Sequence, residues 1–124
     1  MTKAVLILGA TSPIARAAAY ELAATGHPLF LAGRDEQELH RLTQDCRIRY
    51  HVDVKSGCFD ADNCCGHDLF IQYVVKQMGG LEGVIAAFGY HGNRDRAAKD
   101  FTEAEKILLR NFTGACSLLT SCAN

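Results

Sequence analysis

Short apolar runs alternate with longer amphipathic segments along most of this chain. The runs of strand length are Ala4–Leu8, Pro28–Ala32, Arg47–Val52 and Gly83–Ala87. All but the third are almost continuously apolar, which is typical of strands buried on both faces of a parallel sheet. The segments of helical character are Pro13–Thr25, Asp35–Gln44, His67–Met78 and Thr102–Ser121. This order predicts an α/β fold, a doubly wound parallel sheet with right-handed crossovers and helices on both faces.

Residues at the expected helix ends agree with these boundaries. Ser12 is a favourable N-cap with Pro13 at the first helical position, and Gly26 is placed to end that helix. Two further helix starts carry the spacing of a capping box, namely Asp35 with Glu38 and Thr102 with Glu105. No repeat or linker divides the chain, so residues 1–124 are expected to form one domain.

Composition and charge narrow the classes of partner. The 13 basic and 14 acidic residues give a formal net charge of −1, which offers no attraction for nucleic acid or an anionic membrane. No apolar stretch approaches the thickness of a bilayer, so we expect a cytoplasmic protein.

The six cysteines lack Cys-x-x-Cys spacing. A metal site built from Cys58, Cys64, Cys65 and His67 is the alternative, but adjacent cysteines rarely both bind one tetrahedral ion. Free thiols and no metal site are therefore the prediction.

The turn after the first strand has the character of an anion site. Gly9 is followed by Thr11, Ser12, Pro13 and Ile14, so a strand leads through small residues directly into a helix. Free backbone N–H groups and the helix dipole meet at such a point, which suits a pyrophosphate. An ordinary capped βα turn explains the same residues equally well.

At this turn the sequence resembles the short-chain dehydrogenase/reductase family. That family carries Gly-x-x-x-Gly-x-Gly here, and this chain keeps Gly9 but has Pro13 and Ala15 at the later glycines. Ala15 is a mild change, whereas Pro13 removes one N–H from the phosphate cradle. The resemblance implies a Rossmann-like sheet with strand order 3-2-1-4, bound to a dinucleotide cofactor.

The resemblance also implies roles for later residues. NAD enzymes of this kind have an acid at the position of Gly33, and here Arg34 follows that position. The resemblance therefore implies NADP(H) favoured over NAD(H), because a guanidinium binds a 2′-phosphate. Asp53-Val54 stands for the Asp-Val pair that contacts adenine after the third strand, and Ala86-Ala87-Phe88-Gly89 stands for Asn-Asn-Ala-Gly after the fourth. The implied cofactor-binding residues are Gly9, Thr11, Ser12, Pro13, Ile14, Arg34, Asp53, Val54, Ala87 and Gly89.

The catalytic machinery of the family is expected to be incomplete here. Asn111-Phe112-Thr113-Gly114 matches the family's Asn-x-x-Gly, whose asparagine supports a water of the proton relay; a purely structural bond is the alternative. We place Asn111 on the apolar stripe of the last helix, with its amide buried. No tyrosine is followed four residues later by lysine, so the Tyr-x-x-x-Lys pair is absent.

The chain is thus expected to be the NADP(H)-binding portion of a carbonyl or alcohol oxidoreductase. It is truncated after the fourth βα unit, about half a typical member, and should bind cofactor weakly and not turn over. The uncovered edge at Val84–Phe88 suggests association, with a homo-oligomer possible. The alternative is a non-catalytic nucleotide-binding sensor or regulatory module. A receiver domain ranks last, because Gly9-Ala10-Thr11 replaces its paired acids.

Overall fold

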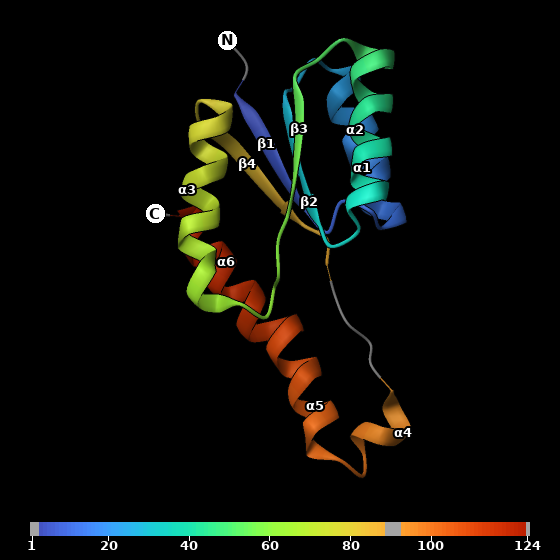
Figure 1. Ribbon diagram of the computed structural model, residues 1–124, viewed down its shortest axis with the longest axis vertical. Coiled ribbons are helices and arrows are strands. Elements are labelled where there is room, and N and C mark those ends of the chain that lie inside the picture. Colours follow the sequence, from blue (N-terminus) through green and yellow to red (C-terminus); the bar gives the residue numbers. More distant parts are fainter. Residues whose placement is uncertain (1–2, 89–92, 124) are drawn as a thin grey trace. The chain divides into compact units, whose positions relative to one another are not determined.

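The computed structural model describes residues 3–88 and 93–123, which form two compact units (Figure 1). The first unit comprises the chain up to Asp60 together with residues 72–88, and it contains the sheet. The second comprises residues 61–71 and the described residues from Asn93 onward, and it is helical.

Four parallel strands form the sheet of the first unit. They are β1 (Ala4–Leu8), β2 (Leu29–Gly33), β3 (Val54–Cys58) and β4 (Leu81–Ala86), in the order β3-β2-β1-β4. Leu6 of β1 pairs with Phe30 of β2 on one side and with Val84 of β4 on the other. The predicted parallel α/β sheet with strand order 3-2-1-4 is confirmed.

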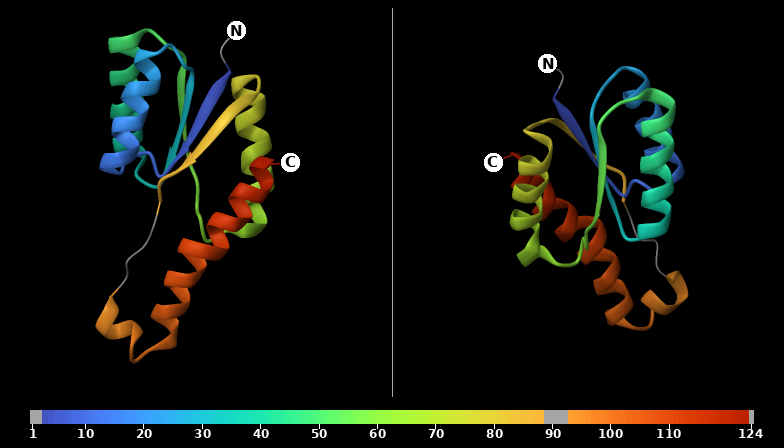
Figure 2. Two further views of the ribbon diagram at one scale, coloured as in Figure 1. Left: turned by 180° about the vertical axis from the view of Figure 1, so that it is seen from behind. Right: turned by 45° about the horizontal axis from the view of Figure 1, so that its top comes forward.

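Helices cover both faces of this sheet, as predicted (Figure 2). On one face lie α1 (Pro13–Ala24) and α2 (Glu36–Tyr50). On the other lie residues 72–78 of α3 (His67–Met78), where the Tyr73 ring meets Phe30 edge to face at 6.2 Å. The apolar pattern of β1 and β2 follows from this double cover, since all their residues are buried.

The core between the sheet and α1 depends on alanines. Ala15, Ala19 and Ala23 repeat every fourth residue on α1 and are fully buried. Small side chains on one helical stripe let the α1 backbone approach the sheet closely, so Leu29 and Leu31 of β2 pack within the same cluster. Each such buried leucine contributes about 1.5–3 kcal/mol through the apolar surface removed from water.

The predicted strand Arg47–Val52 is wrong. These residues continue α2, which ends at Tyr50 with His51 in the left-handed conformation at φ 54°, and the third strand begins at Val54. The alternation of Arg47, Ile48, Arg49 and Tyr50 imitates a strand, yet Ile48 is 70% exposed. The true third strand lies at the sheet edge, where only Val54 is fully buried, so its apolar pattern is too weak to indicate a strand.

The second unit is a series of short helical segments. They are a 3₁₀ turn η1 (Cys64–Gly66), the start of α3, α4 (Arg94–Ala97), α5 (Phe101–Leu108), a π-helical turn η2 (Leu109–Thr113) and α6 (Gly114–Ala123). The last three follow one another as a nearly continuous rod (Figure 2). The helix predicted over Thr102–Ser121 therefore exists, with a π turn inside it. Its N-cap is Asp100, which accepts from Thr102 N at 2.9 Å, so the capping box predicted at Thr102 is wrong.

Gly114 has a packing role within this unit. A Cβ built on it would lie 2.3 Å from the carbonyl oxygen of Ala61, so only glycine fits. Nearby, the Arg110 guanidinium pairs with Asp62 at 2.8 Å, and His67 Nδ1 lies 2.8 Å from Ser117 Oγ. These contacts join residues 61–71 to the helical rod.

Candidate nucleotide-binding site

The carboxyl ends of the four strands meet at one edge of the sheet, because all four are parallel. There Gly9 follows β1, Arg34 follows β2, Phe59 follows β3 and Ala87 follows β4. Open α/β sheets bind their ligands beyond this edge, close to the strands at which the connections change direction. The candidate site is therefore built from these four strand ends.

The turn after β1 is fixed by backbone contacts. Gly9 has φ +78°, and the N–H groups of Gly9 and Ala10 both donate to Ala32 O, at 2.9 and 3.0 Å. A Cβ on Gly9 would lie 2.8 Å from Phe88 N and 2.9 Å from Ala87 C. The glycine is required both for its positive φ and for the close approach of the segment after β4.

The first turn of α1 offers few backbone N–H groups without an acceptor at this edge of the sheet. The predicted N-cap is confirmed, since Ser12 Oγ accepts from Ala15 N at 3.3 Å, and Pro13 occupies the first helical position without an N–H. None of the described residues accepts a hydrogen bond from the N–H of Ile14, whose residue is 79% exposed. The helix start can therefore hold an anion, but with fewer N–H groups than an all-glycine turn.

Arg16 fixes the turn at Thr11 through its side chain. Its Nε donates to Thr11 O at 3.0 Å, and its Nη2 pairs with Glu38 at 2.7 Å. These bonds tie the turn to α2. The Arg16 guanidinium lowers the pKa of Glu38 by hydrogen bonding, so this carboxylate stays charged.

Arg34 and Asp60 form an ion pair across the ends of β2 and β3. The guanidinium lies 3.1 Å from Asp60 Oδ1, and both side chains are more than half exposed, at 54% and 57%. They line a hollow of about 400 Å³ together with Cys58 and Phe59. An exposed pair of this kind contributes about 0–1 kcal/mol, so an incoming anion can replace the carboxylate.

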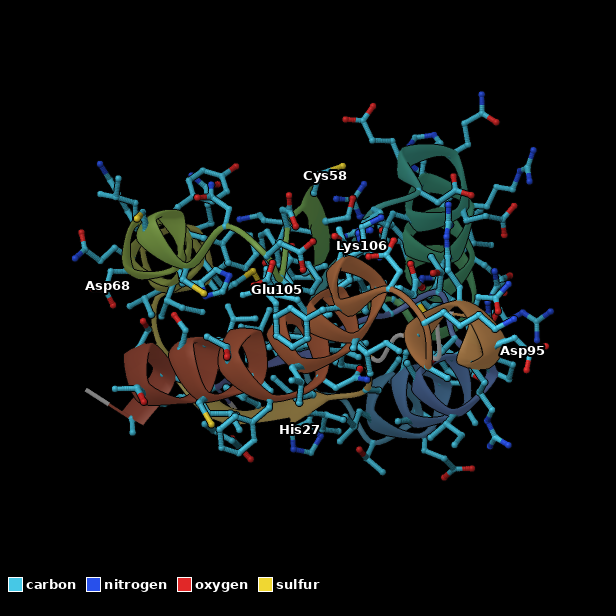
Figure 3. The ribbon with its side chains drawn as sticks, turned by 90° about the horizontal axis from the view of Figure 1, so that it is seen from below. His27, Cys58, Asp68, Asp95, Glu105 and Lys106 are labelled. Carbon is cyan, nitrogen blue, oxygen red and sulfur yellow. The ribbon has the colours of Figure 1, made fainter. Side chains whose placement is uncertain are left out.

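The remaining walls of this edge are aromatic and sulfur-bearing. The Phe59 ring packs against Phe88 with centroids 5.6 Å apart. Cys58 is exposed at the end of β3 (Figure 3), and partial burial together with the nearby Glu36 carboxylate raises the pKa of its thiol. Cys58 therefore remains a neutral thiol at neutral pH.

The placement of Asp53 and Val54 at the end of the third strand is wrong. Val54 is the first residue of β3 and pairs in register with Leu29, the first residue of β2. Asp53 precedes it, with its carbonyl accepting from Leu29 N at 3.0 Å, at the end of the sheet opposite Gly9. The error follows directly from the misassigned strand.

The acid that does follow β3 is Asp60, which sequence reasoning missed. The signal was present in Phe59-Asp60-Ala61-Asp62, an acidic turn seven residues downstream of Asp53. Because α2 extends to Tyr50, the third strand begins only at Val54 and ends at Cys58, just before this turn.

The other expected site residues have different settings. Ala87 donates its N–H to Leu8 O at 2.8 Å and lies against Gly9, as the wall of the turn. Gly89 lies outside the described residues. Asn111 belongs to the second unit, in the π turn η2, and it is exposed rather than buried, contrary to expectation. A π turn adds one residue to a helical turn, which rotates the following residues around the helix. An apolar stripe predicted from regular helical periodicity is therefore interrupted at this turn.

Within residues 3–88 and 93–123, no group of three or more His, Cys, Asp or Glu side chains is arranged to hold a metal ion. All six cysteines are free thiols. No helix of this described part is long and apolar enough to cross a bilayer.

Comparison with known proteins gives one consistent family. A family model for short chain dehydrogenases matches residues 3–124. Two uncharacterized oxidoreductases of Mycobacterium tuberculosis, from strains CDC 1551 and H37Rv, are each 31% identical over 119 residues. Those alignments cover 96% of this chain and 47% of each relative, so the chain spans about half the length of these curated relatives.

Solved structures share the fold. NAD+-bound xylitol dehydrogenase superposes with TM-score 0.87 at 23% identity, over 98% of this chain and 46% of that one. A variant of actinorhodin polyketide ketoreductase with NADPH gives 0.88 at 20% identity, over 99% and 47%. A short-chain dehydrogenase from Sphingobium yanoikuyae in complex with NADPH gives 0.84 at 23% identity, over 98% and 47%.

Proposed function

This chain belongs to the short-chain dehydrogenase family, and on that premise we propose that it is the N-terminal, NADP(H)-binding portion of a carbonyl or alcohol oxidoreductase. One observation carries the proposal: the Gly9 turn, the start of α1 and the Arg34 guanidinium lie at the same sheet edge. The cofactor, when bound, supplies or accepts the hydride, while the protein binds and orients it.

The residues present fit the phosphates of a dinucleotide. The exposed N–H of Ile14 and the positive end of α1 attract the pyrophosphate, and Thr11 and Ser12 form the turn beneath it. Pro13 removes a donor from this cradle, so we expect weaker binding than an all-glycine turn would give.

Arg34 is proposed as the residue that selects NADP(H) over NAD(H). Its guanidinium can bind a 2′-phosphate with paired hydrogen bonds once it leaves the exposed partner Asp60. Asp60 lies at the end of β3, the strand end that the family resemblance associates with the adenine amino group. We assign that contact to Asp60 instead of Asp53.

Asn111 is proposed to support the water of the proton relay, as its Asn-x-x-Gly setting implies. Asn111 lies in the π turn η2, where the residue is exposed. The general acid/base tyrosine and its lysine are lacking from these 124 residues, so the chain alone should not turn over.

Calorimetric titration of the chain with NADPH and with NADH tests the proposal. We expect NADPH to bind about tenfold or more tightly than NADH, because charge-assisted hydrogen bonds contribute about 1.5–3 kcal/mol. Arg34→Gln should remove this preference and leave NADH binding unchanged. Arg41→Gln, which removes an equal charge from a side chain paired with Glu38, is the matched control. Tighter binding of NADH by the unaltered chain would refute the assignment.

A non-catalytic nucleotide-binding module is the second candidate, favoured by Pro13, which removes a backbone donor from the glycine turn. The coding sequence distinguishes the two. Continuation to a serine and a Tyr-x-x-x-Lys pair supports the oxidoreductase, whereas a stop directly after Asn124 supports the module.

A further inference from the structure

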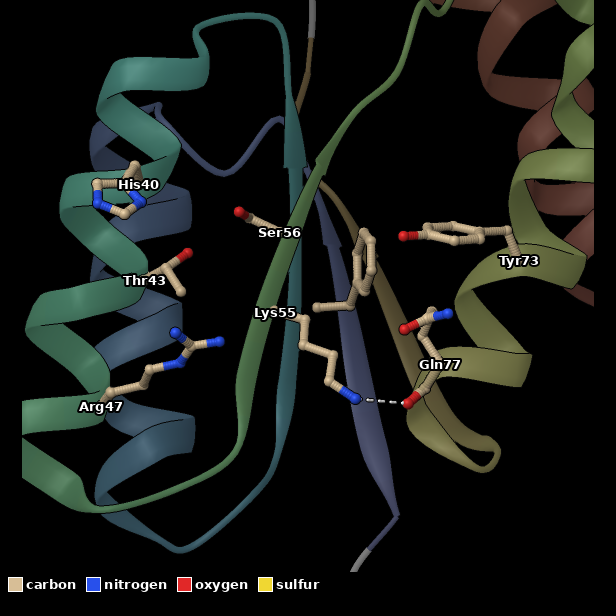
Figure 4. Close-up of a pocket in the computed structure, with 8 residues that line it drawn as sticks. His40, Thr43, Arg47, Lys55, Ser56, Tyr73 and Gln77 are labelled. Carbon is tan, nitrogen blue, oxygen red and sulfur yellow. Dashed lines mark hydrogen bonds between the residues drawn. The ribbon is translucent and has the colours of Figure 1, made fainter.

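A second hollow, of about 320 Å³, opens at the outer edge of β3 (Figure 4). Its lining comes from α2, β2, β3 and α3, and includes His40, Thr43, Arg47, Lys55, Ser56 and Gln77. It shares no lining residue with the hollow beside Arg34. The volume is at the lower end of the range for small-molecule sites, about 300–1,000 Å³.

The charge of this lining favours an anion. Two of the lining residues, Arg47 and Lys55, are basic, and no lining residue is an acid. Lys55 is already engaged, since its Nζ donates to Gln77 O at 2.8 Å and lies 3.9 Å from the Asp53 carboxylate. Arg47 forms no ion pair with any residue in the described part of the chain, so its guanidinium is available to a ligand.

The lining also contains a buried hydroxyl without a partner. Thr43 is 3% exposed, and its Oγ1 makes no hydrogen bond to any described residue. A buried hydroxyl without a hydrogen bond destabilises the fold, and a bound ligand that accepts a hydrogen bond from it would remove this cost. Thr43 and the exposed Arg47 both line the hollow, and exposed side chains change rotamer within picoseconds to nanoseconds, so a ligand can displace Arg47 as it binds.

Ser56 offers two more donors on the opposite wall. β3 has one neighbouring strand in the sheet, β2. Asp53 O accepts from Leu29 N and Phe59 N donates to Gly33 O, so odd-numbered residues direct their backbone groups toward β2. The N–H of Ser56 consequently faces the open edge. Its side chain points toward α2, facing Thr43 across the hollow (Figure 4).

We propose that this hollow binds the phosphate group of a small molecule. Arg47 supplies its forked guanidinium, while Thr43 and Ser56 supply hydroxyl donors from facing walls and Ser56 adds its backbone N–H. Thr43 and Arg47 are one helical turn apart on α2, so they are neighbours on one face of the helix, and both line the hollow. The site is independent of the dinucleotide site and does not rest on its assignment.

The test is an amide chemical-shift titration of the ¹⁵N-labelled full chain with inorganic phosphate, at constant ionic strength set with chloride. We expect saturable shifts at the amides of Ser56 and Thr43. They should persist when NADPH is present in excess and when glycerol phosphate replaces inorganic phosphate. Binding of inorganic phosphate but not of the monoester would contradict a small-molecule ligand.

Two variants separate this site from general charge attraction. Arg47→Gln should weaken phosphate binding about tenfold, and the control Arg41→Gln, which does not line the hollow, should leave it unchanged. Thr43→Val should raise the melting temperature of the ligand-free chain, because it removes the unpartnered hydroxyl, and should lower phosphate affinity several-fold.

Three results would overturn the proposal. One is the absence of shifts at Ser56 under millimolar phosphate. Another is shifts confined to Ile14 and the glycine turn, which would place the phosphate at the start of α1. The third is equal weakening by Arg47→Gln and Arg41→Gln.

Discussion

The centre and the edge of this sheet show how differently a sequence can specify two strands of one layer. All five residues of β1 are buried, and so are all five of β2, whereas β3 buries only Val54 completely. The central strands are covered by helices on both faces, so apolar side chains are required at every position. The edge strand has an open side and tolerates lysine, serine and glycine, which leaves room for polar chemistry.

The candidate sites follow the same division. At the end of central β1, the glycine turn is fixed by backbone packing between Gly9 and Ala87. At the ends of β2 and β3, the site consists of an exposed ion pair that a ligand can rearrange. We therefore expect substitutions at the centre to act on folding, and those near the edge to act on binding.

The largest effect is expected in β2. Leu31→Ala removes a fully buried side chain and should lower the free energy of unfolding by about 2–5 kcal/mol, measured by chemical denaturation. Ser56→Ala in β3 should change it by no more than about 0.5 kcal/mol. Equal losses at the two strands would break the comparison.

The glycine turn should be nearly as sensitive. Gly9→Ala places a Cβ 2.8 Å from Phe88 N at a positive φ, and we expect a loss of about 2–4 kcal/mol in the free energy of unfolding. Gly26→Ala is the matched control: its φ is +90°, but no atom lies within 4 Å of the added Cβ. It should cost only about 1 kcal/mol. If the control is equally damaging, the positive φ and not the contact with Phe88 explains Gly9.

At the strand ends, Asp60→Asn should act on specificity with little effect on folding. Removing the carboxylate ends its competition with a 2′-phosphate for Arg34 and should increase the ratio of NADPH to NADH affinity about two- to fivefold, because the exposed pair is weak. Asp53→Asn, at the opposite end of β3, should leave the ratio unchanged. An effect of Asp53→Asn instead would restore the placement predicted from the sequence.

The smallest effect concerns the pH dependence of stability between α1 and α2. Tyr20 Oη donates to Asp45 at 2.6 Å, and this bond, with Arg49, lowers the pKa of the Asp45 carboxyl. A carboxyl with a depressed folded-state pKa stabilises the fold above its unfolded pKa, and this contribution is lost as the pH falls through the folded value. Tyr20→Phe should flatten the acid limb of the melting temperature against pH. An unchanged acid limb would mean that the bond is not maintained in solution.

The predictable part of this molecule is the part that burial dictates. β1 and α3 were predicted with their observed bounds, and Ser12, Pro13 and Asp35 were identified correctly as residues of helix starts. Each depends on local periodicity or capping, which a single sequence displays directly.

The unpredicted part depends on features that carry no local apolar signal. The alternating residues 47–50 belong to a helix whose buried face is set by Leu39, Leu42 and Cys46. That error misplaced the third strand, and with it the acid expected at the strand end, which is Asp60 and not Asp53. The π turn at Asn111 could not be predicted from the sequence either, because an inserted residue changes the phase of a helix without changing its composition.

The central claim is that the Gly9 turn and Arg34 together receive a phosphorylated dinucleotide. The most direct measurement is a map of backbone amide shifts in the full chain under saturating NADPH and, separately, NADH. We predict that the Ile14 amide shifts with both cofactors and that the Arg34 amide shifts markedly with NADPH alone. Unmoved amides at both residues under saturating NADPH would contradict the claim.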